Sequence, residues 1–348
     1  MKPETGTASA AAQESSFAGD EVILQPFDAS SDQVLPLLIE PAQPGVSLVD
    51  WMTAHKDEFE LALVQHGGIL LRGFSIETVE DFNRFMKCFN TDPLPYMFRS
   101  SPRAELDKSI KNIYMSTSYP SDRSINMHNE SSYSRVWGKK IVFCCLKQAE
   151  EGGETPIADS RRVLQSINPG LVEKFRQKGV KYWRNLVPDL GMPWQEVFQT
   201  EDVNVVEETC RKNKVDYKFI TKDHLQIEWV KKAVYRHPLS GVETWFNHVS
   251  FFNKFSRYEE LGMEPDDCLP DEYLTSDTFF GDGTPITYEE YAEIKRAYQK
   301  NMIVFPYRKG DIIFLDNMLA AHGRSPYKGD RIIATAILEA AYDSDSII

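Results

Sequence analysis

The chain has few cysteines, no long apolar run and no excess of positive charge, and each absence excludes something. Its five cysteines form no CxxC pair, so neither a disulfide framework nor a zinc site is indicated. No apolar stretch approaches the roughly 18 residues that cross a bilayer. A formal net charge of −13 disfavours nucleic acid or an anionic membrane as the main partner. We therefore expect a cytoplasmic protein with reduced thiols and a small-molecule partner.

Nucleotide-binding signatures and internal repeats are absent as well. Without a GxGxxG or Walker sequence, a nucleotide-binding fold has no support. Residues 1–19 are small and polar and lack the apolar segment of a secretory signal, so we expect a disordered tail. The remainder, residues 20–348, is predicted to be one domain because no second linker interrupts it.

Strand patterns occur in both halves of the chain, with helical patterns between them. Strands are predicted at GILLRGF, KKIVFCCLKQA, VETWFNHVSFF (residues 242–252), IIFLDN and RIIATAILEA. A helix is predicted from the cap Ser47 to Gly67. This order favours a mainly β fold with helical insertions, a double-stranded β-helix (jelly-roll or cupin-like) core. The insertions are placed at about 160–235 and 253–301, and the second is a candidate lid.

The tripeptide HNE, at residues 128–130, is the first candidate for chemistry. On an extended segment, residues i and i+2 point the same way, so His128 and Glu130 can reach one metal ion. With 7 histidines and 52 acidic residues, chance gives about one such pair, so a third ligand is needed. His248, on the aromatic segment, and His322, where a predicted strand ends, are the histidines that stand out. Two histidines and one carboxylate are the ligand set of non-haem iron(II).

Five segments, taken in order, resemble the taurine dioxygenase (TauD/TfdA) superfamily. More narrowly, they resemble its SyrP-like branch of hydroxylases associated with nonribosomal peptide pathways. The segments are HGGILLRGF, MHNESSYSRVWGKKIVFCC, EEGGETPIADSRRV, ETWFNH and GDIIFLDNMLAAHGRSPYKGDRI, spread from about residue 66 to 337. The resemblance implies an oxygenase that uses iron(II), 2-oxoglutarate and O2.

The resemblance also assigns roles to individual residues. The implied iron ligands are His128, Glu130 and His322. It implies that Thr155 donates its hydroxyl to the distal carboxylate of 2-oxoglutarate and that Arg331 pairs with the same carboxylate. A planar guanidinium grips a carboxylate through two parallel hydrogen bonds. Arg324, two residues after the last ligand, is the rival for that role.

Two departures from taurine dioxygenase bear on the reaction. The acidic ligand is Glu130 where taurine dioxygenase has aspartate, and because a carboxylate is kept, halogenation is not expected. Thr335 stands where taurine dioxygenase has its sulfonate-binding arginine, on the strand face predicted for Arg331, so a sulfonate substrate is not expected.

The resemblance favours an amino acid substrate, free or tethered to a peptidyl carrier protein, in secondary metabolism. The candidate substrate contacts are Arg99, Arg103, Arg123, Asn247, His248 and Thr335. Hydroxylation is the favoured outcome. Desaturation, cyclisation, epimerisation and oxidative cleavage stay open, because the outcome depends on which substrate carbon lies near the metal. A non-catalytic jelly-roll binding protein and a zinc hydrolase are the alternatives from other classes.

Overall fold

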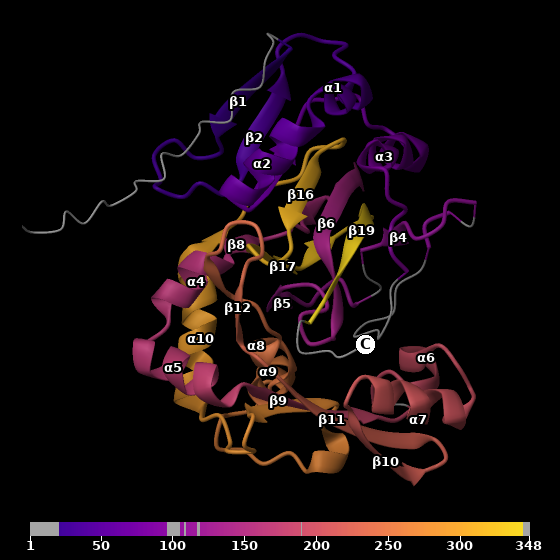
Figure 1. Ribbon diagram of the computed structural model, residues 1–348, viewed down its shortest axis with the longest axis vertical. Helices are drawn as coiled ribbons and strands as arrows, with labels where there is room; N and C mark the ends of the chain where they lie inside the picture. The colour runs from indigo at the N-terminus through magenta and orange to yellow at the C-terminus, as the bar shows by residue number, and fades with distance from the viewer. Residues whose placement is uncertain (1–20, 96–104, 108, 117–118, 189, 344–348) are drawn as a thin grey trace, which may run out of the picture.

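The computed structural model describes residues 21–95, 105–107, 109–116, 119–188 and 190–343 (Figure 1). The expected tail lies outside the described residues, and so do the substrate candidates Arg99 and Arg103. Two β-sheets form the core in the upper half of Figure 1, and a second group of helices and strands lies below it. No helix among the described residues is long and apolar enough to span a membrane.

The larger core sheet has seven strands in the order β1-β2-β3-β16-β6-β19-β4. Its strands are β1 (Val22–Pro26), β2 (Leu37–Pro41), β3 (Gly68–Leu71), β16 (Ile312–Asp316), β6 (Val136–Lys147), β19 (Ile332–Tyr342) and β4 (Tyr114–Met115). Strands β2 and β3 pair in parallel, and the other neighbours are antiparallel. The longest pairing joins β6 to β19, so the two halves of the chain share this sheet.

The smaller core sheet packs against one face of the larger one. Its strands, in order, are β15 (Met302–Ile303), β8 (Ile157–Asp159), β17 (Ala320–Arg324) and β5 (Ile125–His128). Ile157 and Ala320 of this sheet share a hydrophobic cluster with Ile141, Ile313 and Leu315 of the larger sheet. Two sheets packed in this way form the jelly-roll core that the sequence predicted, so the fold class is confirmed.

Helices cover the other face of the larger sheet. They are α1 (Leu48–Ala54), α2 (Lys56–His66), α3 (Val79–Met86) and the short 3-10 helix η1 (Lys87–Phe89). Successive strand residues point to opposite faces. Phe314 therefore meets the rings of Phe59 and Phe89 on the helical side, whereas Ile313 faces the smaller sheet.

The segment predicted as one helix after Ser47 forms two. Ser47 is the N-cap, as predicted, and its hydroxyl accepts the N–H of Asp50. Helix α1 ends and α2 begins at His55, whose φ of −121° and ψ of 26° are not helical. The apolar pattern runs across this break because both helices bury rings, Trp51 and Phe59, in the same core cluster.

The second group of elements comes mainly from residues 160–301. Its sheet has the order β10 (Asp216–Thr221), β11 (His224–Lys231), β9 (Val180–Leu186), β14 (Ser276–Phe280). Its helices are α4 (Ser160–Ser166), α5 (Pro169–Lys178), α6 (Trp194–Phe198), α7 (Val203–Lys212), α8 (Val249–Phe252), α9 (Lys254–Leu261), η2 (Asp271–Tyr273) and α10 (Tyr288–Asn301). Two further pairs of strands are β12 (Val234–Arg236) with β13 (Glu243–Trp245), and β7 (Glu151–Gly152) with β18 (Tyr327–Lys328).

The strand predicted for residues 242–252 is wrong beyond Trp245. The side chain of Asn247 donates to the backbone oxygen of Ala233 and accepts the N–H of Val249 at 3.0 Å. A side chain that binds the backbone locally in this way competes with strand pairing. The chain therefore turns at this point and continues as α8.

Candidate metal centre

Three side chains meet at one buried point of the core. His128 ends β5, His322 lies in the middle of β17, and the two residues are direct partners in the antiparallel pairing. Glu130 follows β5 in a turn. One ligand atom from each residue lies within 4.8 Å of the others, and all three residues are buried. The structure thus brings together the three residues that were predicted as iron ligands.

The atoms of this group suit a divalent metal ion. Nε2 of His322 and a carboxylate oxygen of Glu130 are 3.9 Å apart. That distance is too long for a hydrogen bond and shorter than two metal–ligand bonds of about 2.1 Å each. Nδ1 of His128 donates to the backbone oxygen of Asn126 at 2.8 Å, so its Nε2 keeps a lone pair for a metal. Two imidazoles and one carboxylate fit iron(II) with open positions.

Glu130 does not lie on extended backbone, contrary to the i, i+2 interpretation of HNE. It lies in a turn in which the N–H of Ser132 donates to the oxygen of Asn129 at 3.2 Å. Ser131, the next residue, has a φ of +54°. The turn, rather than strand alternation, directs the carboxylate toward the two histidines.

A cavity of about 1200 Å³ opens at the two histidines. One wall comes from the core strands β5 and β17, and the opposite wall comes from β9, α8, α9 and α10. The ring of Phe251 lies 4.8 Å from that of His128, and the ring of Phe143 lies 4.9 Å from that of His322, centroid to centroid. The metal end of the cavity is therefore lined by apolar rings.

Thr155 and Arg331, the residues predicted to bind 2-oxoglutarate, both line this cavity. The Thr155 hydroxyl accepts a hydrogen bond from the phenol of Tyr307 at 2.8 Å, which leaves its own proton to be donated elsewhere. Arg331 donates from Nε to the oxygen of Gly153 at 2.7 Å and from Nη1 to the Ser116 hydroxyl at 3.2 Å. Burial lowers the pKa of Arg331, so an anionic partner would stabilise its charged form.

Arg324, the rival arginine, is committed to the backbone of a neighbouring loop. Its guanidinium donates to the carbonyl oxygens of Tyr119, Pro120 and Arg123, the first at 2.9 Å and the last at 2.6 Å. Burial lowers the pKa of Arg324, and the charge of Arg331 lowers it further. Arg324 thus holds the loop at residues 119–123, and Arg331 is the better candidate for a co-substrate carboxylate.

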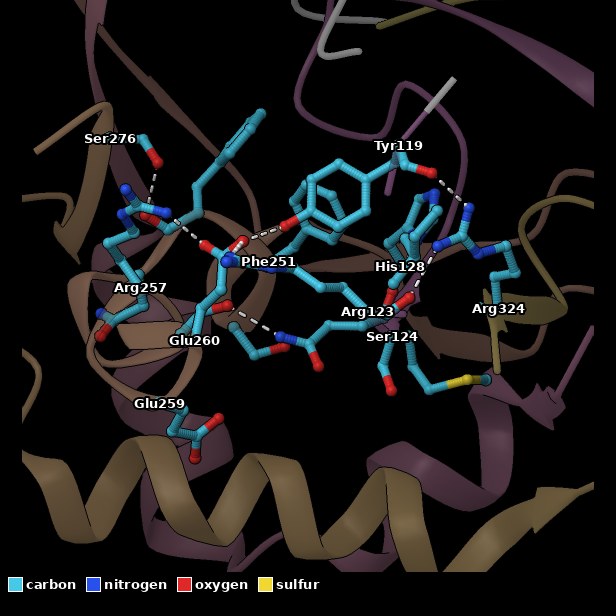
Figure 2. A pocket seen from close by; sticks show the side chains of 18 of the residues that line it. Tyr119, Arg123, Ser124, His128, Phe251, Arg257, Glu259, Glu260, Ser276 and Arg324 are labelled. Atoms are coloured by element: carbon cyan, nitrogen blue, oxygen red, sulfur yellow. Dashed lines mark hydrogen bonds and ion pairs between the residues drawn. The ribbon is translucent and has the colours of Figure 1, made fainter. Parts of the chain in front are cut away.

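Arg123 lines the cavity, but its charge is paired (Figure 2). The carboxylate of Glu260, on α9, accepts hydrogen bonds from Arg123, from the phenol of Tyr119 and from Arg257, the last at 2.6 Å. These contacts tie the loop at residues 119–123 to α9 across the cavity.

Three other substrate candidates, Asn247, His248 and Thr335, are not among the described residues that line the cavity. The Asn247 side chain is used within the turn before α8. His248 is buried with Nδ1 2.7 Å from the Ser132 hydroxyl, and burial lowers its pKa well below the usual value. Thr335 is fully buried in β19, paired with Phe143.

Three residues of this region were not predicted from the sequence. Arg184, on β9, lines the cavity with its guanidinium 5.3 Å from the ring of Phe252. Tyr307 orients Thr155, and Asn317 contacts Glu130. Only Asn317 had a signal, because it lies inside the matched segment GDIIFLDNMLAAHGR. Nothing in the local pattern of the other two singles them out.

The chain matches the family described as taurine catabolism dioxygenase TauD, TfdA family, over residues 32–337. It is 36% identical over 309 residues to dapdiamide synthesis protein DdaC of Enterobacter agglomerans, covering 86% of this chain and 93% of that protein. It is 24% identical over 330 residues to a clavaminate synthase-like protein of Arabidopsis thaliana, covering 87% and 93%. This chain therefore belongs to the TauD/TfdA family of dioxygenases, as the motifs predicted.

Solved structures share the fold. PvcB from Pseudomonas aeruginosa aligns with a TM-score of 0.54 and 16% identity, covering 97% of this chain and 95% of that one. PvcB, of which a second structure also matches, is an Fe, alpha-ketoglutarate dependent oxygenase from an isonitrile synthetic pathway. AAD-2, in complex with Mn(II) and N-oxalylglycine, aligns with a TM-score of 0.52 and 12% identity, covering 94% and 99%.

Proposed function

We propose that this dioxygenase uses iron(II) and 2-oxoglutarate to hydroxylate an unactivated C–H bond of an amino acid or of a carrier-tethered aminoacyl group. The observation that carries the proposal is the convergence of His128, Glu130 and His322, whose two histidines line the same cavity as Thr155 and Arg331. When bound, iron(II) with 2-oxoglutarate and O2 supplies the oxidant, and succinate and CO2 are the other products.

The residues of this chain hold and orient the reactants. His128, Glu130 and His322 would hold the metal, and the cavity that opens at the two histidines would give its other ligands access. Thr155 and Arg331 bind the distal carboxylate of 2-oxoglutarate and so fix how the co-substrate approaches the metal. The rings of Phe251 and Phe143 beside the two histidines would limit the access of water to the reacting atoms.

The size of the cavity favours a substrate with an extension. At about 1200 Å³ the cavity exceeds the roughly 300–1,000 Å³ of ordinary small-molecule sites. A free amino acid with 2-oxoglutarate would leave much of it to solvent, whereas a tethered aminoacyl group would extend along it. Two similar proteins, the dapdiamide synthesis protein DdaC and the isonitrile-pathway oxygenase PvcB, support a place in secondary metabolism.

The test is 2-oxoglutarate turnover by the purified protein. With iron(II), ascorbate and 2-oxoglutarate, the wild type should release succinate, more so when free and carrier-bound amino acids are screened as substrates. His322→Ala should release none, and His66→Gln, at the end of a helix away from the site, should match the wild type. Full succinate release by His322→Ala would refute the ligand assignment.

Two further readouts separate the alternatives. Product mass distinguishes hydroxylation, which adds one oxygen, from desaturation, which removes two hydrogens. Retention of zinc with no dependence on 2-oxoglutarate would support the zinc hydrolase instead.

A further inference from the structure

The turn between β16 and β17 places a fully buried asparagine against the backbone of Glu130. Oδ1 of Asn317 accepts the N–H of Glu130 at 2.7 Å, and Nδ2 donates to the carbonyl oxygens of Glu130 and Gly138, both at 2.8 Å. The side chain of Asn129 in turn donates to the backbone oxygen of Asn317 at 2.8 Å. The side-chain amide of Asn317 thus binds both the N–H and the C=O of Glu130.

This contact matters because Glu130 lies in a turn. A strand residue has its backbone fixed by ladder hydrogen bonds, whereas Glu130 lies beyond the end of β5. The position of its carboxylate therefore depends on what holds the turn. The rigid amide of Asn317 holds the N–H and the C=O of Glu130 and is itself held to Gly138. It therefore determines where the backbone of Glu130 lies relative to His322, which is five residues after Asn317 on the next strand.

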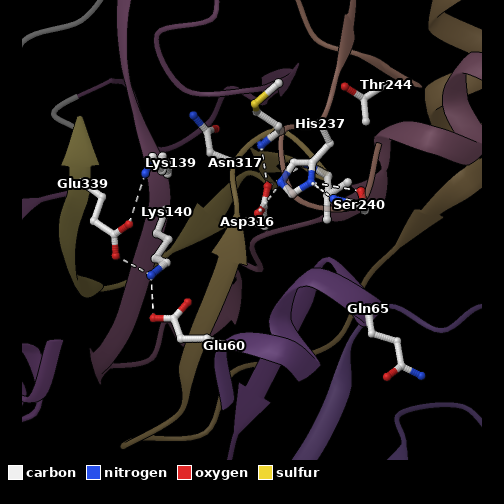
Figure 3. A network of polar contacts seen from close by, with 12 residues as sticks. Glu60, Gln65, Lys139, Lys140, His237, Ser240, Thr244, Asp316, Asn317 and Glu339 are labelled. Atoms are coloured by element: carbon white, nitrogen blue, oxygen red, sulfur yellow. Dashed lines mark hydrogen bonds and ion pairs between the residues drawn. The ribbon is translucent and has the colours of Figure 1, made fainter. Parts of the chain in front are cut away.

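The turn that carries Asn317 is held in its own place (Figure 3). Oδ1 of Asp316 accepts the N–H groups of Met318 and Leu319 at 2.9 and 3.1 Å, and Oδ2 lies 3.0 Å from Nε2 of His237. The backbone N–H of Ser240 donates to Nδ1 of His237 at 3.1 Å. Because Nδ1 accepts, the ring proton is on Nε2 and is donated to Asp316.

His237 follows β12, in the hairpin that β12 forms with β13, so this contact joins the hairpin to the core. The ring and the carboxylate are both buried. The chain of contacts runs from His237 to Asp316, from the neighbouring Asn317 to Glu130, and so to the metal position.

We propose that Asn317 is a positioning residue for the Glu130 carboxylate and that the His237–Asp316 pair holds Asn317 in register. The inference rests on the proposed function, because it takes Glu130 as a metal ligand. Groups behind metal ligands typically change metal affinity by about 10- to 100-fold when they are altered. A residue that only stabilises the fold would change stability and leave metal affinity unchanged.

The experiment measures Mn(II) affinity by calorimetric titration, together with the thermal stability of the metal-free protein. Asn317→Ala should bind Mn(II) about 10- to 100-fold more weakly. The matched control is Asn301→Ala, since Asn301 is a buried asparagine whose amide binds Ala297 and Ser166 at the end of α10. The control should lose stability and keep wild-type Mn(II) affinity.

A second pair of variants covers the case in which Asn317→Ala does not fold. His237→Ala removes the donor to Asp316 and should weaken Mn(II) binding, whereas His237→Gln places an amide N–H near the same position and should restore most of the affinity. If Asn317→Ala folds and binds Mn(II) like the wild type, the inference is overturned. If it does not fold, wild-type affinity in His237→Ala overturns the inference.

The His322→Ala variant keeps this test apart from that of the proposed function. Loss of Mn(II) binding in His322→Ala, with normal binding in the Asn317 and His237 variants, refutes the positioning role alone. A wild-type protein that binds no Mn(II) and consumes no 2-oxoglutarate refutes both.

Discussion

His128 and His322 are direct cross-strand partners, and their ring centroids lie 4.4 Å apart. Side chains directly opposite one another on an antiparallel pair lie on the same face of the sheet. A shift of β17 by one residue would turn His322 to the other face. The register of two short strands therefore determines whether a metal site exists at all.

Gly323→Ala should disturb that register. A Cβ at Gly323 would lie 2.7 Å from the backbone oxygen of Ile125 and 3.1 Å from the sulfur of Met127, so β17 must move away from β5. We expect Mn(II) affinity to fall by about tenfold or more, which is the usual effect of altering residues that support metal ligands. Gly281→Ala, whose Cβ would lie 2.0 Å from the oxygen of Lys178, should destabilise the fold without this loss. Equal Mn(II) affinities in the two variants would contradict the prediction.

Glu130→Asp should keep the charge and withdraw the carboxylate by about 1.5 Å, one C–C bond. A displacement of this size near a reacting centre costs about 100-fold in rate. We expect succinate release to fall by that order. Glu130→Gln keeps the length of the side chain and removes its charge, so its rate of succinate release should fall at least as far. Steady-state rates at saturating 2-oxoglutarate measure both, and a Glu130→Gln enzyme as fast as the wild type would show that the carboxylate is not a ligand.

Arg331→Lys should raise the KM for 2-oxoglutarate. Lysine offers a point charge in place of the planar fork and cannot keep the hydrogen bonds to Gly153 and Ser116 while it binds a carboxylate. Loss of a charged hydrogen bond worth about 1.5–3 kcal/mol predicts a rise of roughly 10- to 100-fold. Arg324→Lys should mainly lower stability, because Arg324 binds loop carbonyls. A larger KM effect at Arg324 than at Arg331 would reverse the assignment.

Asp277 should make stability fall as pH rises from about 4 to 6. Burial raises the pKa of Asp277 to about 6, so the unfolded chain, in which the pKa of this carboxyl group is 3.8, loses the proton at lower pH. The proton on Asp277 therefore adds about 3 kcal/mol to the free energy of unfolding below pH 3.8, and this contribution is lost by pH 6. Both backbone N–H groups that bind Asp277, those of Lys254 and Thr278, donate to Oδ1, which an amide oxygen can replace.

Urea unfolding of the wild type and of Asp277→Asn at several pH values measures this effect. In the variant, the free energy of unfolding should fall less between pH 4 and 6, because the contribution of Asp277 is absent. Parallel pH profiles for the two proteins would show that Asp277 does not titrate in this range.

The residues of the candidate site could be predicted from motif order, but their surroundings could not. His128, Thr155, His322 and Arg331 lie in short segments whose sequence matches the family, and the structure places all four on one cavity. The turn that directs Glu130 depends on a contact from a distant part of the chain, which a local pattern does not contain.

Two further residues show the same limit. The alternation and aromatic content of residues 242–252 predict a strand, yet the Asn247 side chain binds its own backbone and ends it. Of two arginines near the end of the chain, the resemblance favoured Arg331 for the co-substrate and left Arg324 as the rival. The observation against Arg324 is its set of contacts to carbonyl oxygens, and these come from a loop about two hundred residues earlier in the sequence.

Strand β17 packs against both walls of the cavity. Ala320 belongs to the jelly-roll core, and its neighbour Ala321 belongs to the cluster that the helices α8, α9 and α10 form around Trp245, Phe280 and Tyr291. Polar side chains of α10 that line the cavity, such as Lys295 and Gln299, lie outside this shared cluster. Substitutions of such residues can reshape the space offered to a substrate and leave the ligand strands undisturbed. A lineage built on this plan can exchange one substrate for another while its oxidation chemistry is inherited intact.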